Sequence, residues 1–297
     1  MVLEIEAVQN SFLEGIDKYD NDYERYKFIH NKIITSCAYN LESLTYTNPS
    51  EFKNEGDIYG ALVQKSPSNE GYSRAFQYIC KLAGLECLYV VGDKEITTDA
   101  GTTYKRHSWN IIPIDGKYYN IDLTSDDPVF TGVGNDGHDP RYVQCVSYSF
   151  MNVTDAKMAE NGIVSRHSST DYNVDGATGE CYYQTPEIAT DRDNTYFAKE
   201  GVFFASLAEQ DVDNVAKLTQ HVLKELNKGE LSISFEIQGY ADLDQIGKRV
   251  ESEKIIQAVM AANNSNEREY NVVDYITYET IPNDEIVLIF RVTPRIK

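Results

Sequence analysis

A helical pattern followed by a β-hairpin pattern occupies residues 69–123. Apolar side chains recur at helical spacing from Tyr72 onward, and the helix is predicted to end at Gly84, a residue type common at helix C-termini. Two strands are then predicted, joined by Asp115-Gly116, a pair typical of two-residue hairpin turns. This order predicts a helix beside an antiparallel sheet that has one wetted face.

The flanking sequence extends this pattern in both directions. Apolar residues at steps of three and four from Asp20 to Ile34 predict a further helix, with cap residues at its start. Residues 41–60 are polar and predict a loop. A strand is expected over residues 85–91 and a polar loop over 92–106, and the hairpin strands are expected at 107–114 and 117–123.

Three positions in this region combine residue types that suit nucleophilic catalysis. His107 opens one predicted strand and Asp122 lies on the next, so Asp122 can orient the imidazole ring and stabilise its charged form. Asn69 stands at the predicted start of the helix, where free N–H groups lower a thiol pKa and stabilise an oxyanion. The order of helix start, His and Asp is the layout of papain-like cysteine enzymes.

Three motifs in this stretch resemble those of the transglutaminase-like superfamily in its bacterial form. They are Gly60-Ala61-Leu62-Val63 with Gly71-Tyr72 and Ala75-Phe76; His107, Trp109 and Asn110; and Asp122, Thr124, Asp126, Asp127 and Pro128. The resemblance covers roughly residues 10 to 160 and implies an α+β fold. It implies a papain-like core of N-terminal helices and an antiparallel sheet with a Cys-His-Asp triad.

One departure from the family pattern bears on activity. The resemblance places the nucleophilic cysteine at position 69, where this chain has Asn69, and an amide is not a nucleophile under ordinary conditions. Cys80 is eleven residues further along the helix, about 16 Å away at 1.5 Å per residue. Ser68 and Ser73 are near enough to be considered as substitutes. The predicted site is therefore Asn69, His107 and Asp122, supported by Trp109, Ser68 and Tyr72.

Composition excludes several classes of partner. With 27 Lys and Arg against 47 Asp and Glu, the net charge of −20 disfavours nucleic acid. No apolar run reaches the ~18 residues of a transmembrane helix. The five cysteines and five histidines are scattered, and Asn135–Asp139 lacks EF-hand spacing, so no metal or other cofactor is predicted. No signal peptide is visible, which leaves an intracellular protein and a secreted or cell-surface protein without its leader both open.

A second domain is predicted because periodicity fades between residues 161 and 192 and then returns. The expected domains are residues 1–185, transglutaminase-like, and residues 186–297, a small α+β unit. The second domain is expected to hold a strand or hairpin at 196–207, a helix at 209–226 and a strand at 231–237, followed by a helix at 243–262 and strands at 271–279 and 284–292.

Three functional hypotheses remain open at this stage. The first is an inactive transglutaminase-like protein whose cleft binds a peptide or protein between tyrosine-rich walls, since the chain has 22 tyrosines. The second is an acyl-transfer or peptide-hydrolysing enzyme whose cysteine was replaced by Asn69, with His107 as base and Asp122 as its orienting partner. The third is a structural or cell-surface module that binds through residues 186–297. The sequence leaves the oligomeric state open.

Overall fold

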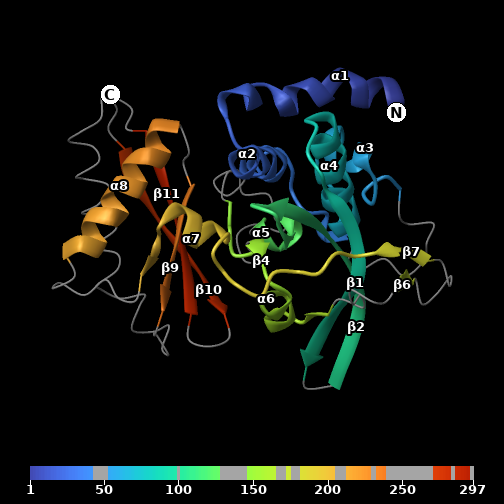
Figure 1. The fold of residues 1–297 in the computed structure, drawn as a ribbon. Helices are drawn as coiled ribbons and strands as arrows, with labels where there is room; N and C mark the ends of the chain where they lie inside the picture. Colours follow the sequence, from blue (N-terminus) through green and yellow to red (C-terminus); the bar gives the residue numbers. More distant parts are fainter. Residues whose placement is uncertain are drawn as a thin grey trace. The chain divides into compact units, whose positions relative to one another are not determined.

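The computed structural model describes residues 1–42, 53–98, 101–127, 146–164, 172–174, 181–204, 212–228, 232–238, 270–281 and 285–294 (Figure 1). The chain divides into two compact units. The first comprises Met1–Gln144 with Ser149–Asn194, and the second comprises Cys145–Tyr148 with Thr195–Lys297. Among the described residues, no helix is both long and apolar enough to cross a membrane.

The first unit begins with a group of helices. They are α1 (Val2–Leu13), η1 (Ile16–Lys18), α2 (Asp22–Ile34), α3 (Ile58–Leu62) and α4 (Asn69–Leu82). The predicted helix at 20–34 is confirmed as α2, and its N-cap Asn21 accepts a hydrogen bond from the Glu24 amide. The helix predicted from residue 69 is confirmed as α4; it ends before Gly84, whose φ of 73° suits glycine.

An antiparallel sheet of five strands completes this unit, in the order β4-β3-β2-β1-β5. Its elements are β1 (Leu88–Thr98), β2 (Gly101–Ile114), β3 (Lys117–Ile121), α5 (Leu123–Asp126), β4 (Met151–Val153), α6 (Asp155–Glu160) and β5 (Ile163–Val164). A separate pair, β6 (Tyr172–Val174) and β7 (Cys181–Gln184), also belongs to the first unit. The predicted hairpin turn is confirmed, with positive φ at Asp115 and Gly116.

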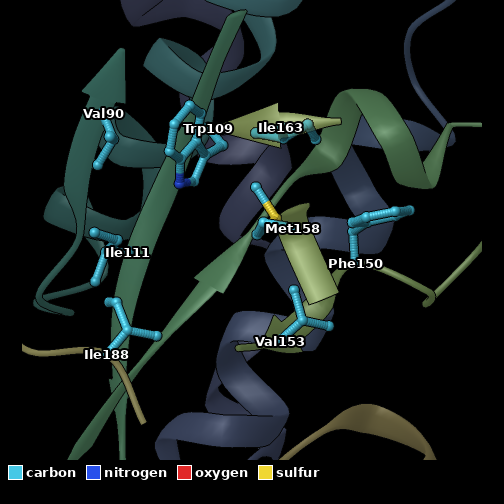
Figure 2. Close-up of a cluster of buried hydrophobic side chains, with 8 residues drawn as sticks. All are labelled: Val90, Trp109, Ile111, Phe150, Val153, Met158, Ile163 and Ile188. Carbon is cyan, nitrogen blue, oxygen red and sulfur yellow. The ribbon is translucent and has the colours of Figure 1, made fainter. Parts of the chain in front are cut away.

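Buried side chains hold the sheet to its helices. On α4 the buried set lies at helical spacing and comprises Tyr72, Ala75, Phe76, Ile79 and Cys80. A cluster around the strands comprises Val90, Trp109, Ile111, Phe150, Val153, Met158, Ile163 and Ile188 (Figure 2). Trp109 and Ile111 are two residues apart on β2 and so share one face of the sheet. Burial of this stripe fixes the register of the strand that carries His107.

Two expectations for the first unit are wrong. Residues 92–106 are not a polar loop, because β1 and β2 stay in register as far as Thr98 opposite Gly101 and form a long ribbon (Figure 1). Threonines and Ile96 favour extended backbone there, although most of these side chains lie outside the core. The second hairpin strand ends at Ile121 rather than residue 123, because Asp122 caps the start of α5.

The second unit contains a four-stranded sheet in the order β10-β11-β9-β8, with α8 alongside it (Figure 1). Its elements are α7 (Tyr196–Glu200), β8 (Phe203–Phe204), α8 (Val212–Lys228), β9 (Ser232–Gln238), β10 (Tyr270–Ile281) and β11 (Glu285–Pro294). Leu218 and Val222 are buried on α8, as are Ile233 and Phe235 on β9. The helix predicted at 209–226 and the strands predicted at 231–237, 271–279 and 284–292 are confirmed to within a few residues.

One expectation in the second unit is wrong. The strand predicted at 196–207 begins as helix α7, which follows Thr195 and ends at Gly201 with a left-handed φ of 67°. The helix predicted at 243–262 and the Asn135–Asp139 run lie outside the described residues. That residues 1–185 and 186–297 are two domains that fold independently stays a prediction.

Candidate functional site

His107 and Asp122 form a buried pair at the open end of the β2–β3 hairpin. The Nε2 atom of His107 lies 2.7 Å from Oδ2 of Asp122, and the two residues are 4% and 0% exposed. The expectation that these side chains lie within hydrogen-bonding reach is confirmed. Because Asp122 engages Nε2, Nδ1 is the ring nitrogen that can exchange a proton with a substrate. Their catalytic roles stay a prediction.

Asp122 is held in place by the start of α5 as well as by His107. Its Oδ1 accepts hydrogen bonds from the amides of Thr124 and Ser125, as an N-cap carboxylate does. Its Oδ2 accepts a further hydrogen bond of 2.7 Å from the Ser125 hydroxyl. Burial acts to raise the pKa of Asp122, but His107 and the Ser125 hydroxyl outweigh it and hold the pKa below its ordinary value. Asp122 is therefore a stable anion that can orient the imidazole ring.

Trp109 supports the His107 ring from the same strand. Its ring is stacked beside that of His107, with centroids 6.1 Å apart and planes inclined by 21°. Its Nε1 donates to Oδ1 of Asn120 on β3 at 2.8 Å, and the whole side chain is buried. Trp109 is therefore held by burial and by this hydrogen bond, and its ring limits the movement of the imidazole beside it.

Asn69 is the first residue of α4, as the family pattern requires of the nucleophile position. The N-cap, Ser68, donates its hydroxyl to the Glu55 carbonyl at 3.2 Å and makes no side-chain cap. The Ser73 hydroxyl donates to the Asn69 carbonyl at 2.9 Å. Both serine hydroxyls are thus bound to backbone oxygens rather than to a general base, which disfavours their use as nucleophiles.

Contacts from the first turns of α4 connect it to both remaining motifs. Glu70 Oε1 lies 3.1 Å from Nη2 of Arg106, the residue before His107. The Tyr72 hydroxyl donates a hydrogen bond to Oδ2 of Asp127. Residues adjacent to Asn69 therefore contact residues near His107 and Asp122. That Asn69 itself faces His107 remains a prediction.

Two glycines of the family motif allow the backbone to pack closely here. A Cβ on Gly60 would lie 2.1 Å from the Asn54 carbonyl oxygen, and one on Gly71 would lie 2.2 Å from the Glu55 carbonyl oxygen. Both distances are far inside van der Waals contact, so only glycine fits unless the backbone moves. The two glycines position the segment at 54–55, which in turn accepts the Ser68 hydroxyl.

Asp127 is a partly buried carboxyl whose environment differs from that of Asp122. Burial raises its pKa to about 7, and the hydrogen bond from Tyr72 opposes only part of that rise. Tyr72 is itself buried, which raises its own pKa, and its ring stacks on that of Tyr39 with centroids 6.5 Å apart. Tyr72 is therefore a packed residue that contacts Asp127 and Tyr39, and its supporting role at the site stays a prediction.

The buried thiols of Cys37 and Cys80 lack the environment of a reactive thiolate. Burial raises the pKa of Cys37 to about 12, and its Sγ contacts the Ala61 carbonyl oxygen. Burial also raises the pKa of Cys80, near the far end of α4. A reactive thiol needs the opposite conditions, partial exposure and nearby positive charge. The side chains of Cys145 and Cys181 lie outside the described residues.

A second buried His–Asp pair was not predicted. His30 of α2 places Nε2 3.0 Å from Oδ2 of Asp126, and neither side chain has solvent exposure. His30 Nδ1 lies 3.0 Å from Asn31 Oδ1, and Asp126 Oδ1 accepts the Phe150 amide at 2.9 Å. One usable signal was present, since His30 lies among the apolar positions of its helix. This pair connects α2 to α5 and so supports the segment that carries Asp122.

The first part of the chain is similar to known proteins. Residues 10–123 match the family model of the Transglutaminase-like superfamily. Over 134 residues the chain is 26% identical to Kyphoscoliosis peptidase of Homo sapiens, an alignment that covers 41% of this chain and 20% of that protein. A solved structure described as a TGase is 16% identical with a TM-score of 0.34, covering 46% of this chain and 34% of that one. The predicted transglutaminase-like, papain-like α+β fold is confirmed for the matched part of the chain.

Proposed function

Since the chain carries a transglutaminase-like domain, we propose that this domain is catalytically inactive as written and binds an extended peptide segment beside His107. The observation that carries the proposal is the combination of a complete His107–Asp122 pair with Asn69 as the first residue of α4. The orienting partner and the base are retained, while the position at the helix start has no thiol. An amide there cannot form an acyl-enzyme intermediate.

The edge of β2 supports the peptide-binding part of the proposal. Among the described strands, β3 pairs with β2 only over Asn110–Ile114, so residues 101–109 pair with β1 alone. The Glu95 amide donates to the Gly162 carbonyl, away from β2. Because backbone polar groups alternate in antiparallel pairs, Tyr104 opposite Glu95 directs its N–H and C=O away from β1. A peptide can add as a strand along this edge and reach His107.

The first experiment tests inactivity by restoring the missing thiol. The full chain, its Asn69→Cys variant and the double variant Asn69→Cys, His107→Ala are assayed on labelled amine and peptide substrates, with and without iodoacetamide. We expect no turnover by the chain as written and iodoacetamide-sensitive turnover by Asn69→Cys. We expect the double variant to lose most of that gain, because a thiol without its base is mostly protonated near neutral pH.

Two results would change the proposal. Iodoacetamide-sensitive turnover by the unmodified chain would show that another cysteine is the nucleophile. The proposal that the domain is inactive would then be wrong. Turnover by Asn69→Cys at the rate of an efficient enzyme, beyond the partial gain expected here, would favour the alternative, an acyl-transfer or peptide-hydrolysing enzyme whose cysteine has been replaced. The word peptidase in the name of the human relative supports the hydrolysing form of that alternative.

The second experiment tests binding at the β2 edge. Peptides selected from a random displayed library against the full chain are titrated into the chain, Tyr104→Pro and Tyr104→Ala. Proline removes the edge N–H, whereas alanine keeps it and removes only the exposed phenol ring. We expect Tyr104→Pro to weaken binding at least about 10-fold beyond Tyr104→Ala, about the worth of one backbone hydrogen bond. Equal affinities would exclude strand addition at this position.

A further inference from the structure

Three metal-ligating side chains converge within the second unit, apart from the site described above. His221 and Glu225 lie one turn apart on α8, and Glu200 is the last residue of α7. Each offers one ligand atom, and these three atoms all lie within 4.8 Å of one another. We refer to these three residues as the α7–α8 cluster.

The α7–α8 cluster is withdrawn from solvent. His221 and Glu225 are 4% and 3% exposed, and the Glu200 side chain is 1% exposed. Lys224, which is about half exposed, forms an ion pair with Glu200. Buried carboxylates are costly unless positive charge lies close to them. A proton on the imidazole or a bound metal ion can each provide that charge among the three donors.

We propose that the α7–α8 cluster binds one divalent transition-metal ion of the zinc class. Ligand atoms on Zn²⁺ lie about 2.0–2.2 Å from the metal, so two ligands of a tetrahedral site are about 3.3–3.6 Å apart. The three atoms here lie within 4.8 Å of one another, so side-chain movements on the order of 1 Å bring them to tetrahedral positions. The structure therefore holds the donors close to binding positions.

The donor set selects this class of ion. One imidazole nitrogen with two carboxylate oxygens suits zinc and its neighbours, whereas Ca²⁺ and Mg²⁺ prefer oxygen ligands alone. The ion would fasten α7 to α8, since it takes ligands from both helices. Sequence spacing does not reveal this site, because β8 and the first turns of α8 lie between Glu200 and His221 along the chain.

The test is metal binding by the untagged full chain after chelator treatment and dialysis. ZnCl₂ is titrated by calorimetry, and CoCl₂ is added separately so that visible absorption reports a nitrogen ligand in a low-coordinate site. We expect one equivalent of Zn²⁺ to bind and to raise the thermal midpoint of the chain. Glu225→Gln and His221→Gln should each weaken binding at least about 10-fold.

A matched control separates this site from general attraction to an acidic chain. Asp213→Asn removes one carboxylate from the exposed first turn of the same helix and should leave Zn²⁺ affinity unchanged. Equal losses in Asp213→Asn and Glu225→Gln, or no bound Zn²⁺ in the unmodified chain, would overturn the proposal. If Glu225→Gln does not fold, Glu200→Gln decides the question from the other helix, and unchanged affinity there would also overturn it.

Discussion

Two buried His–Asp pairs lie in the first unit, and their carboxylates belong to the same short helix. Asp122 is the N-cap of α5 and contacts His107 at 2.7 Å, while Asp126 is the last residue of α5 and contacts His30 at 3.0 Å. In residue type, burial and separation the pairs are nearly the same. The difference between them lies in what surrounds each imidazole.

The His30 ring is enclosed. Both ring nitrogens face oxygen atoms, of Asn31 and Asp126, and the remaining oxygen of Asp126 accepts a backbone amide. His107 instead uses Nε2 for Asp122 and stands at the end of an open strand edge near the start of α4. A His–Asp contact alone therefore does not indicate catalysis. Access of the second ring nitrogen to a reacting group distinguishes a candidate site from a structural tie.

The largest expected effect is on stability, and it separates the two histidines. His30→Ala should lower the free energy of unfolding of the first unit by about 3–5 kcal/mol, because it leaves a buried carboxylate without its imidazole and opens a cavity. His107→Ala should cost only about 1–2 kcal/mol, because Asp122 keeps the Ser125 hydroxyl and two amide donors. Urea unfolding is followed by the fluorescence of Trp109, the one tryptophan in the chain.

Trp109 belongs to the first unit, so its fluorescence reports the unit that holds both histidines. The two alanine variants serve as controls for each other, because the same atoms are removed from each. Equal losses of stability would contradict the distinction between His30–Asp126 as a structural pair and His107–Asp122 as a candidate site pair.

The next effect concerns Asp127, a third carboxyl of this segment, which contacts a tyrosine instead of a histidine. Its folded pKa of about 7 exceeds its ordinary value of 3.8, so the folded chain keeps a proton that the unfolded chain releases between these values. The free energy of unfolding should therefore fall as the pH rises from about 4 to about 7. Asp127→Asn should remove about 2–4 kcal/mol of this fall, from a shift of about three pKa units at about 1.4 kcal/mol each.

Asp122→Asn is the matched control, because the sign of its effect is opposite. The lowered pKa of Asp122 stabilises the fold above pH 3.8, and this contribution is lost as the pH falls through the folded pKa. Asp122→Asn should thus weaken the fold at pH 7 and make little difference in acid. Unfolding in urea at a series of pH values, followed by Trp109 fluorescence, measures both variants. A pH profile of Asp127→Asn that matches the unmodified chain would show that Asp127 titrates normally.

The sequence predicted α2, α4 and α8, the hairpin and the His107–Asp122 contact, because these depend on local periodicity, turn chemistry and short-range pairing. The loop predicted at residues 92–106 was wrong. Their polar side chains show no apolar alternation, but backbone pairing across the β1–β2 ribbon makes them strands. His30–Asp126 was missed because its partners are 96 residues apart, and that separation closes only when α2 packs near α5. The α7–α8 cluster was missed for the same reason.

Site roles were only partly predictable for a different reason. Motif spacing located Asn69, His107 and Asp122, but it could not show that the hydroxyls of Ser68 and Ser73 are bound to backbone carbonyls. It also could not show why the motif has Gly60 and Gly71, which is the close approach of the backbone at 54–55. These properties arise from contacts that form in the folded chain and have no separate pattern along the sequence.

The smallest expected effect tests which groups other than His107 stabilise the Asp122 carboxylate. Ser125→Ala removes a hydroxyl that donates to Asp122 Oδ2 at 2.7 Å, and it should cost about 1 kcal/mol and raise the pKa of Asp122. Thr124→Val is the control: the adjacent Thr124 hydroxyl is buried and makes no hydrogen bond to a described residue, so its loss should be neutral or slightly stabilising. Carboxyl chemical shifts followed by NMR against pH give the pKa directly. If Ser125→Ala leaves both quantities unchanged, His107 and the two amide donors set the charge of Asp122 without the hydroxyl. Asp122 would then depend more on its imidazole, and His107→Ala should cost more than about 1–2 kcal/mol.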